Sequence, residues 1–278
     1  MSTSVIPANP TAVTSVTDRR AARGGLNGRI LAIELRRVLR NRRTMIFTLI
    51  FPMAMFLFIT SQIAPSEQSL GTGVGANVNA VIMVNMAVYG AIMASTTAGA
   101  SVSVERALGW SRQLRLTPLQ PVAYIVTKMI AALVMGAIAC FVAFATGAVT
   151  GKAHAALESW VLCAVVIILG ALVFAAFGLF LGYLLPADSA LQFMGGILAL
   201  LSMLGGIFFP IQEGSTFDHV AALTPLYGLG KLAAWPLSLT SSGHLDPFKP
   251  LWAVNLLVWA AIFVGGAAWR FRLDTARV

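Results

Sequence analysis

One segment of the sequence has residue types that could hold a nucleotide phosphate. Residues 147–153 read Gly-Ala-Val-Thr-Gly-Lys-Ala, which is close to a phosphate-binding loop. Such a loop needs one more residue between its glycines and a Ser or Thr after the lysine, because that hydroxyl ligates Mg²⁺. Ala153 stands in place of the hydroxyl, and the charge pattern described below puts this segment outside the cell. We therefore expect no ATP binding by this route.

The remaining reactive side chains form no catalytic or metal-binding pattern. His154, His219 and His244 lack metal-ligand spacing, and Cys140 and Cys163 lie inside apolar runs. The sequence has no HExxH or GxSxG motif and no close pair of carboxylates. No Asp or Glu falls in the middle of an apolar run, which disfavours coupling to protons. We expect neither an enzyme nor a metal site.

Residues 103–121 combine charged, aromatic and apolar side chains as a protein-docking surface does. Glu105 and Arg106 open this segment and Pro118 and Pro121 close it. Trp and Arg are favoured anchors at protein interfaces. A simple solvated loop is the alternative. The residues expected to dock a partner are Glu105, Arg106, Gly109, Trp110, Arg112, Leu114 and Arg115.

A second charged segment, residues 26–43, predicts a basic amphipathic helix in the inner membrane interface. Its apolar face is formed by Leu31, Leu35, Val38 and Leu39. Its basic face is formed by Arg29, Arg36, Arg40 and Arg43. The helix is expected to anchor the chain to anionic lipids, to act as a lever joined to the first span, or to do both.

The elements that position these segments are expected to be membrane spans. Of the 278 residues, 58% are hydrophobic and 10% are charged, against roughly 25% charged in an average soluble domain. A single soluble globular domain is thereby excluded. Residues 1–25 predict a disordered cytoplasmic tail, and 26–278 an all-α membrane domain. The six expected spans are 44–64, 78–101, 122–149, 157–185, 189–211 and 250–269.

The arginines predict the orientation. They gather before the first span, between the second and third, and after the sixth. With six spans all of these lie on one side, and the positive-inside rule places both termini in the cytoplasm of a cell-membrane protein. The net charge of +9 is then a topology signal, so a nucleic-acid role is not expected. The long connection 212–249 falls outside, where it predicts a re-entrant segment between spans five and six.

Polar and small residues recur at helical spacing in two spans. Small residues let helices approach closely and polar ones bond across them, so helix packing is one interpretation. A substrate pathway is the other. The polar residues concerned are Asn85, Tyr89, Thr96, Gln192 and Ser202. Gly178 and Gly182 form a small-xxx-small motif, which predicts close packing against a neighbouring helix.

These segments together resemble the membrane subunit of ABC type-2 transporters. The resemblance rests on Glu105-Arg106, on Gly109 and on residues 114–119, with Lys128 following. A looser match is residues 205–210 followed by 223–227. Together these matches cover about residues 26–272. The chain lacks the second acidic residue and the Gly-Thr that many members carry in the loop.

The resemblance implies a permease powered by a separate ATPase subunit, which would bind ATP and Mg²⁺, so that this chain needs no cofactor. It implies two permeases, identical or related, with two ATPases. Residues 26–43 would be the elbow helix and 103–117 the coupling helix. The expected function is export of hydrophobic or amphipathic small molecules, of the drug and antibiotic resistance type. Export of lipid or cell-envelope precursors, and a non-transporting anchor or sensor, are the alternatives.

Overall fold

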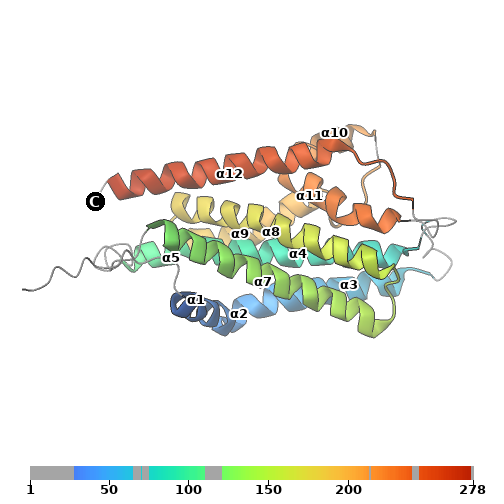
Figure 1. Ribbon diagram of the computed structural model, residues 1–278, viewed down its shortest axis with the longest axis horizontal. Coiled ribbons are helices and arrows are strands. Elements are labelled where there is room, and N and C mark those ends of the chain that lie inside the picture. Colours follow the sequence, from blue (N-terminus) through green and yellow to red (C-terminus); the bar gives the residue numbers. More distant parts are fainter. Residues whose placement is uncertain are drawn as a thin grey trace, which may run out of the picture.

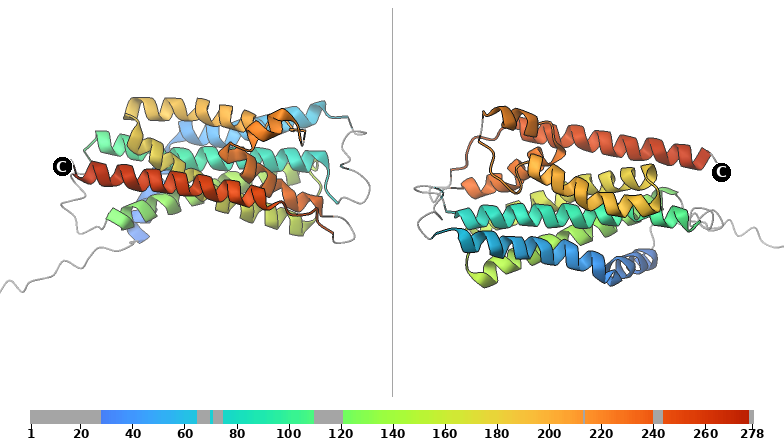
Figure 2. Two further views of the ribbon diagram at one scale, coloured as in Figure 1. Left: turned by 90° about the horizontal axis from the view of Figure 1, so that it is seen from above. Right: turned by 180° about the vertical axis from the view of Figure 1, so that it is seen from behind.

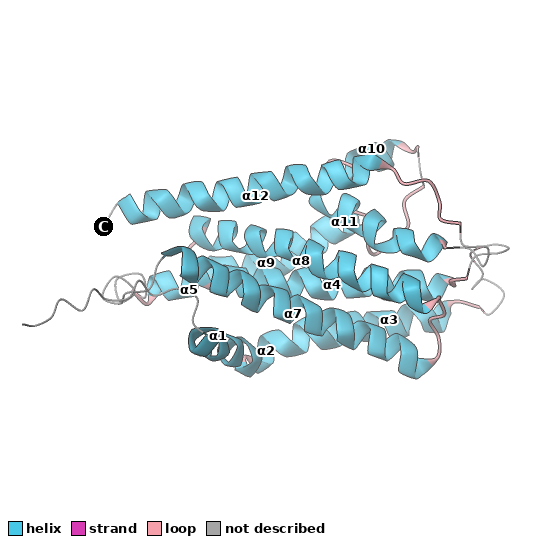
Figure 3. Ribbon diagram, in the orientation of Figure 1, coloured by secondary structure: helices cyan, strands magenta, loops and turns pink. Residues whose placement is uncertain are grey.

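The computed structural model describes residues 28–64, 70, 75–109, 121–212, 214–239 and 244–276, leaving out the side chains of 43–44, 121, 188–192 and 273–276. Every regular element in these ranges is a helix (Figure 3). The tail 1–25, predicted to be disordered, lies outside the described residues.

The first half of the chain forms a short crosswise helix and three long helical paths. Helix α1 (Gly28–Arg40) lies across the direction of the long helices (Figure 1). An unbroken helical path follows, made of α2 (Arg42–Met45), the π-helix η1 (Ile46–Ile50) and α3 (Phe51–Gln62). The chain returns through α4 (Val78–Ala100), the short α5 (Val102–Ala107) and then α7 (Pro121–Thr150).

The second half adds three long helices and a group of short ones. The long helices are α8 (Leu157–Leu184), α9 (Ala187–Leu204) and α12 (Pro250–Ala276). Between the last two lie α10 (Thr216–Ala221), α11 (Pro225–Ala234) and the 3-10 helix η3 (Trp235–Ser238). α11 starts at Pro225, whose fixed φ suits a first helical position.

Four helices are long and apolar enough to cross a membrane. They are Val78–Ala107, Val122–Thr150, Leu157–Leu184 and Pro250–Arg272, and they match the expected spans two, three, four and six. The described parts of the expected first and fifth spans are shorter apolar helices, Ile46–Gln62 and Phe193–Leu204. The fifth ends early because Gly206 adopts a φ of 80°, which a residue with a side chain rarely takes.

Helix α4 is the centre of the bundle and α12 its edge. Most α4 side chains are buried, against α7, α8, α3, α9 and α11. α12 packs against α8 and α11 and leaves most of its apolar side chains exposed. It lies on the outside of the bundle in each view (Figure 2).

The α4–α8 contact is close because both helices carry small residues. A Cβ at Gly178 would lie 2.1 Å from the Thr96 carbonyl oxygen, and one at Gly182 would lie 3.1 Å from that of Ala100. The Thr96 hydroxyl donates to the Phe174 carbonyl at 3.2 Å. The predicted packing role of the Gly178–Gly182 motif is therefore confirmed.

The long helices alternate in direction and so separate two ends of the molecule. One end holds α1, α5, the start of α7 and the last described residues of α12 (Figure 1). The other end holds α10 and the described residues just before α4, α8 and α12. We call these the α1 end and the α10 end.

Candidate functional site

At the α1 end, the carboxylate of Glu105 in α5 lies inside the helix bundle. Ser101 connects α4 directly to α5, and the α5 backbone hydrogen bond from Glu105 N–H to the Ser101 carbonyl continues the helical path. This geometry buries Glu105 to 5% exposure. A carboxylate this deeply buried must be paired, since an unpaired buried charge costs several kcal/mol.

Glu105 has three partners from two other helices. Arg37 of α1 and Lys128 of α7 both form ion pairs with its Oε1 atom. The Tyr124 hydroxyl, also from α7, donates to Oε2. Lys128 is only 2% exposed, so its ammonium depends on these acidic partners for its charge to be tolerated at this depth.

A second carboxylate, Glu34 of α1, completes the cluster. Its Oε1 accepts from Lys128 Nζ at 2.7 Å and from Arg37 Nη2 at 2.8 Å. Two cations thus face two carboxylates, and the Ser101 hydroxyl lies 3.4 Å from Lys128 Nζ. We call Glu34, Arg37, Glu105, Tyr124 and Lys128 the ion cluster. It joins α1, α5 and α7 through side chains alone.

The guanidinium of Arg37 keeps its charge in this setting. Burial would lower the pKa of Arg37, but the carboxylates of Glu105 and Glu34 raise it above its ordinary value. Arg37 is also the most exposed member of the four charged residues, at 45% for its side chain. Among the described residues, the cluster is therefore most accessible at Arg37 of α1.

Arg106 fixes the other side of α5. Its Nη1 atom donates to the carbonyls of Gly182 and Tyr183, at 3.3 and 3.0 Å, and its guanidinium lies over the Tyr183 ring. These carbonyls end α8, where a cation is favourable because the helix dipole is negative there. The Glu105-Arg106 pair thus ties α5 to α1 and α7 on one side and to α8 on the other.

Only part of the predicted docking segment can be compared with the structure. Glu105 lies inside the protein and Arg106 is half-buried. Gly109 ends the α5 turn with a φ of 72°, a backbone conformation suited to glycine. The other predicted docking residues lie outside the described residues: Trp110, Arg112, Leu114 and Arg115.

The basic helix has the faces that its sequence predicts, with one exception. Leu31, Leu35 and Val38 are half-buried, and Val38 packs beside Met129 and Ala132. Leu39, expected on the same face, is 42% exposed. Arg29, Arg36 and Arg40 are exposed, and the side chain of Arg43 is not described.

The predicted pathway residues do not share one environment. Tyr89 is buried between the rings of Phe51 and Phe208, with centroids 5.8 and 5.0 Å away. Ser202 is buried and donates to the Leu198 carbonyl of its own helix at 2.6 Å. Thr96 lies in the α4–α8 contact, and the side chain of Gln192 is not described.

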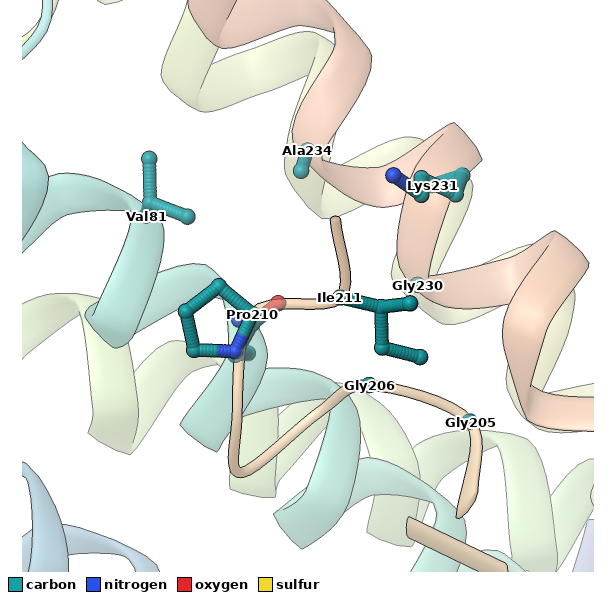
Figure 4. A pocket seen from close by; sticks show the side chains of 9 residues that line it. Val81, Gly205, Gly206, Pro210, Ile211, Gly230, Lys231 and Ala234 are labelled. Atoms are coloured by element: carbon teal, nitrogen blue, oxygen red, sulfur yellow. The ribbon is translucent and has the colours of Figure 1, made fainter. Parts of the chain in front are cut away.

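Asn85 instead lines a cavity toward the α10 end of the molecule. The cavity has a volume of about 150 Å³ (Figure 4). Its walls come from α4, from the chain that follows α9 and from α11. The lining residues are Val81, Asn85, Gly205, Gly206, Pro210, Ile211, Gly230, Lys231 and Ala234.

Sequence reasoning missed three members of the ion cluster: Glu34, Arg37 and Tyr124. Two signals were present. Glu34 is the one acidic residue between positions 26 and 43, and Lys128 interrupts an apolar run. A lone cation in an apolar helix requires an opposite charge from elsewhere in the fold, and the lone acid of the preceding basic helix is a candidate.

Comparisons with known proteins agree with the family resemblance seen in the sequence. A model of the family described as ABC-2 type transporter matches residues 28–230. A relative in Bacillus subtilis (strain 168), described as "Putative transport permease YvfS", is 27% identical over 209 residues, covering 73% of this chain and 82% of the relative. The chain therefore belongs to the ABC-2 type transporter family, as a multi-pass transport permease of the membrane.

Proposed function

We propose that this chain is the permease subunit of an ATP-driven exporter that moves hydrophobic or amphipathic small molecules, such as drugs and antibiotics, out of the cell. A separate ABC ATPase supplies the energy, and it holds the ATP and Mg²⁺. Membership of the ABC-2 family supports the transport role. The ion cluster is the observation that supports coupling between the ATPase and the permease. It links three helices at the end where the expected docking loop starts.

Six crossings are part of this proposal. The path α2–η1–α3 is unbroken over residues 42–62, which gives about 30 Å at 1.5 Å per residue. That length matches the hydrocarbon thickness of a bilayer. α9 would provide the fifth crossing. The buried helix α11, which packs against α4, α8 and α12, would be the re-entrant segment.

The α1 end is the cytoplasmic end in this arrangement. The exposed cations Arg29, Arg36 and Arg40 lie there, and the cytoplasmic leaflet attracts basic residues. Helix α1 then rests in the inner interface as the elbow helix, with its basic side toward lipid head groups. Both termini follow on the same side.

Force would enter through residues 110–117 and spread through the ion cluster. Trp110, Arg112, Leu114 and Arg115 would contact the ATPase directly. Glu105 would not touch the ATPase itself, since its carboxylate is buried between α1 and α7. It would pass the movement of α5 to those helices. A displacement of α5 would therefore move α1 and the start of α7 together, and those helices continue into the membrane. Two permeases and two ATPases would form the working unit.

Partnership tests this function most directly. The tagged permease is co-expressed with the ABC ATPases of its genome, beginning with any encoded beside it. We expect one ATPase to remain bound through gentle extraction and purification. The permease alone is expected to hydrolyse no ATP. Purification of the permease without any ATPase would contradict the proposal and favour an anchor or sensor.

A charge reversal in the docking segment sharpens this test. Arg115→Glu is expected to reduce ATPase recovery at least tenfold, since a charged anchor contributes roughly 2 kcal/mol or more at an interface. Arg272→Glu is the matched control, because it reverses a charge at the same end on α12. Equal recovery with both variants would remove Arg115 from the interface. Transport is then measured as ATP-dependent uptake of a fluorescent amphiphile by inside-out vesicles.

A further inference from the structure

The two cysteines of the chain lie in neighbouring helices, Cys140 in α7 and Cys163 in α8. Both are free thiols, and the two residues are only 1% and 0% exposed. The sequence indicates no use for them, because each lies inside an apolar run and no local spacing joins them. The fold makes α7 and α8 antiparallel neighbours (Figure 1), so the position of each thiol along the shared contact decides whether they meet.

Two contacts, one on each side of Cys140, fix the register of α7 against α8. On one side, a Cβ at Gly136 would lie 2.9 Å from the Ala171 Cβ. On the other side, the rings of Phe144 and Trp160 pack edge to face, with centroids 5.4 Å apart. Cys140 lies four residues from both Gly136 and Phe144, so these three residues share one face of α7. That face is the one that packs against α8.

The same contacts place Cys163 on the facing side of α8. It comes three residues after Trp160, Ile167 comes four residues later and Ala171 four after that, which is the spacing of one helix face. Between the two contacts, this register sets Cys140 opposite the turn that runs from Cys163 to Ile167. All three residues belong to the main buried apolar cluster. The two thiols also interact electrostatically, as sulfur atoms that lie close together do.

Two thiols in an apolar interior suit one class of metal ion. Among the described residues, no group of three or more His, Cys, Asp or Glu side chains could hold a metal, so the four-coordinate geometry of structural zinc is not available there. Soft ions prefer thiolate ligands, and those with filled d shells bind two thiolates in a line. Mercury(II) forms a neutral complex with two thiolates, whereas copper(I) or silver(I) would leave a net negative charge. An unpaired charge is costly in apolar surroundings.

We propose that Cys140 and Cys163 form a binding site for mercury(II), in which the metal bridges both sulfur atoms and ties α7 to α8. Mercuric chloride is an uncharged molecule, so it can pass through an apolar layer and reach buried thiols. Its two Hg–Cl bonds break as two Hg–S bonds form, the two thiol protons leave with the two chlorides, and mercury stays in its +2 state. That this bridge would also block transport, by holding α7 against α8, rests on the proposed function; the binding itself does not.

Native mass spectrometry of the purified permease tests the site. The chain in detergent is titrated with mercuric chloride, and loosely bound metal is then removed with glutathione. We expect one mercury per chain, with a mass gain of one mercury less two protons and with no chloride. Two mercury atoms that each keep a chloride would show that the thiols react separately, and this would overturn the proposal. A chain that takes up no mercury would overturn it as well.

Single variants measure what the bridge contributes. Cys140→Ala and Cys163→Ala are each expected to hold mercury at least about a hundredfold more weakly against glutathione, because the second thiolate of the pair binds within the same molecule. Mercury should raise the unfolding temperature of the unchanged chain but not that of either variant. Equal retention of mercury by a single variant and the unchanged chain would contradict a two-sulfur site.

Moving one thiol along α8 tests the register. In the Cys163→Ala background, Ile167→Cys puts a thiol one turn further on the same face and is expected to restore the bridge. Val165→Cys is the matched control, because Val165 is 48% exposed and lies off that face. A thermal unfolding curve shows that each variant is folded. Bridging by both variants would overturn the proposal, since any two thiols would then suffice. These measurements require no ATPase, so their failure and that of the partnership test are independent.

Discussion

At the scale of single residues, the ion cluster makes Lys128 and Glu105 depend on each other. Lys128 is almost fully buried, and two carboxylates from different helices offset its charge. Removing Glu105 leaves two cations against the single carboxylate of Glu34. Breaking a buried pair by removing one partner typically costs about 3–5 kcal/mol. The exposed side of Arg37 lets solvent reduce that penalty here.

A double-mutant cycle measures this dependence. We expect Glu105→Gln and Lys128→Met each to lower the unfolding temperature of the permease, because each leaves an opposite charge unpaired. The double variant should lose at least about 1 kcal/mol less than the sum of the two. Unfolding in detergent, followed by circular dichroism, gives the comparison. Strictly additive losses would mean that the two side chains do not interact.

The same cluster shows what single residues reveal in sequence. From its place before Arg106 and Gly109, Glu105 was predicted to be a docking residue. Its role as an internal partner was not, because Glu34 and Lys128 are 94 positions apart and no local spacing brings them together. Such contacts depend on how α1 packs across α7. The helical periodicity of each segment does not predict that packing.

At the scale of helices, the α4–α8 contact depends on the absence of side chains. Gly99 and Gly178 face each other's helices so closely that a Cβ at either would meet backbone atoms within 2.5 Å or less. Backbone atoms cannot move aside as a flexible side chain does. The two helices would have to separate, which would also break the hydrogen bond from Thr96 to Phe174.

Substitution at this contact should therefore be costly. Gly178→Ala is expected to destabilise the permease by about 1–3 kcal/mol, the usual cost of overpacking. Gly265→Ala on α12 is the matched control, because nothing lies within 4 Å of the added Cβ. Folded yield and unfolding temperature in detergent are compared for both. If the two variants behave alike, the close contact does not determine stability.

Helix periodicity predicted this contact and most of the α1 faces. It did not show that Asn85, Tyr89 and Thr96 of α4 lie in different surroundings. Asn85 and Thr96 lie on the same side of one helix, about 16 Å apart along its axis. Over that length the neighbouring element changes. α11 and the chain after α9 face Asn85 across a cavity, whereas α8 covers Thr96 completely. The spacing of residues in the sequence predicts which face of the helix they share. Their position along the helix axis decides which element packs against them.

At the scale of the whole molecule, the two ends differ in charge and in fold. The α1 end carries the exposed arginines and the ion cluster. The α10 end carries short helices around a small cavity. Four of the six spans expected from hydropathy are helices long enough to cross a membrane. The other two are apolar helices at the expected positions, but they are shorter than expected. Gly206 follows the early end of the fifth, where its φ of 80° does not continue a helix.

Accessibility of introduced cysteines tests the orientation. Leu157 at the start of α8 and Leu108 after α5 are 79% and 75% exposed, at opposite ends. The native Cys140 and Cys163 are buried, so they give little background. With the permease expressed alone, a membrane-impermeant maleimide should label Leu157→Cys in intact cells. Leu108→Cys should label only after the cells are opened. The reverse pattern would invert the proposed topology.

The ion cluster also has a consequence for biosynthesis. Glu34 and Arg37 leave the ribosome early, whereas Lys128 and Tyr124 follow only after α4 and α5 have been made. Until α7 is made, Glu34 lacks the Lys128 ammonium and α1 lacks its packing contact with α7. We therefore expect α1 to dock fully only after α7 has been made, so nascent chains stopped before residue 128 should leave α1 open to protease.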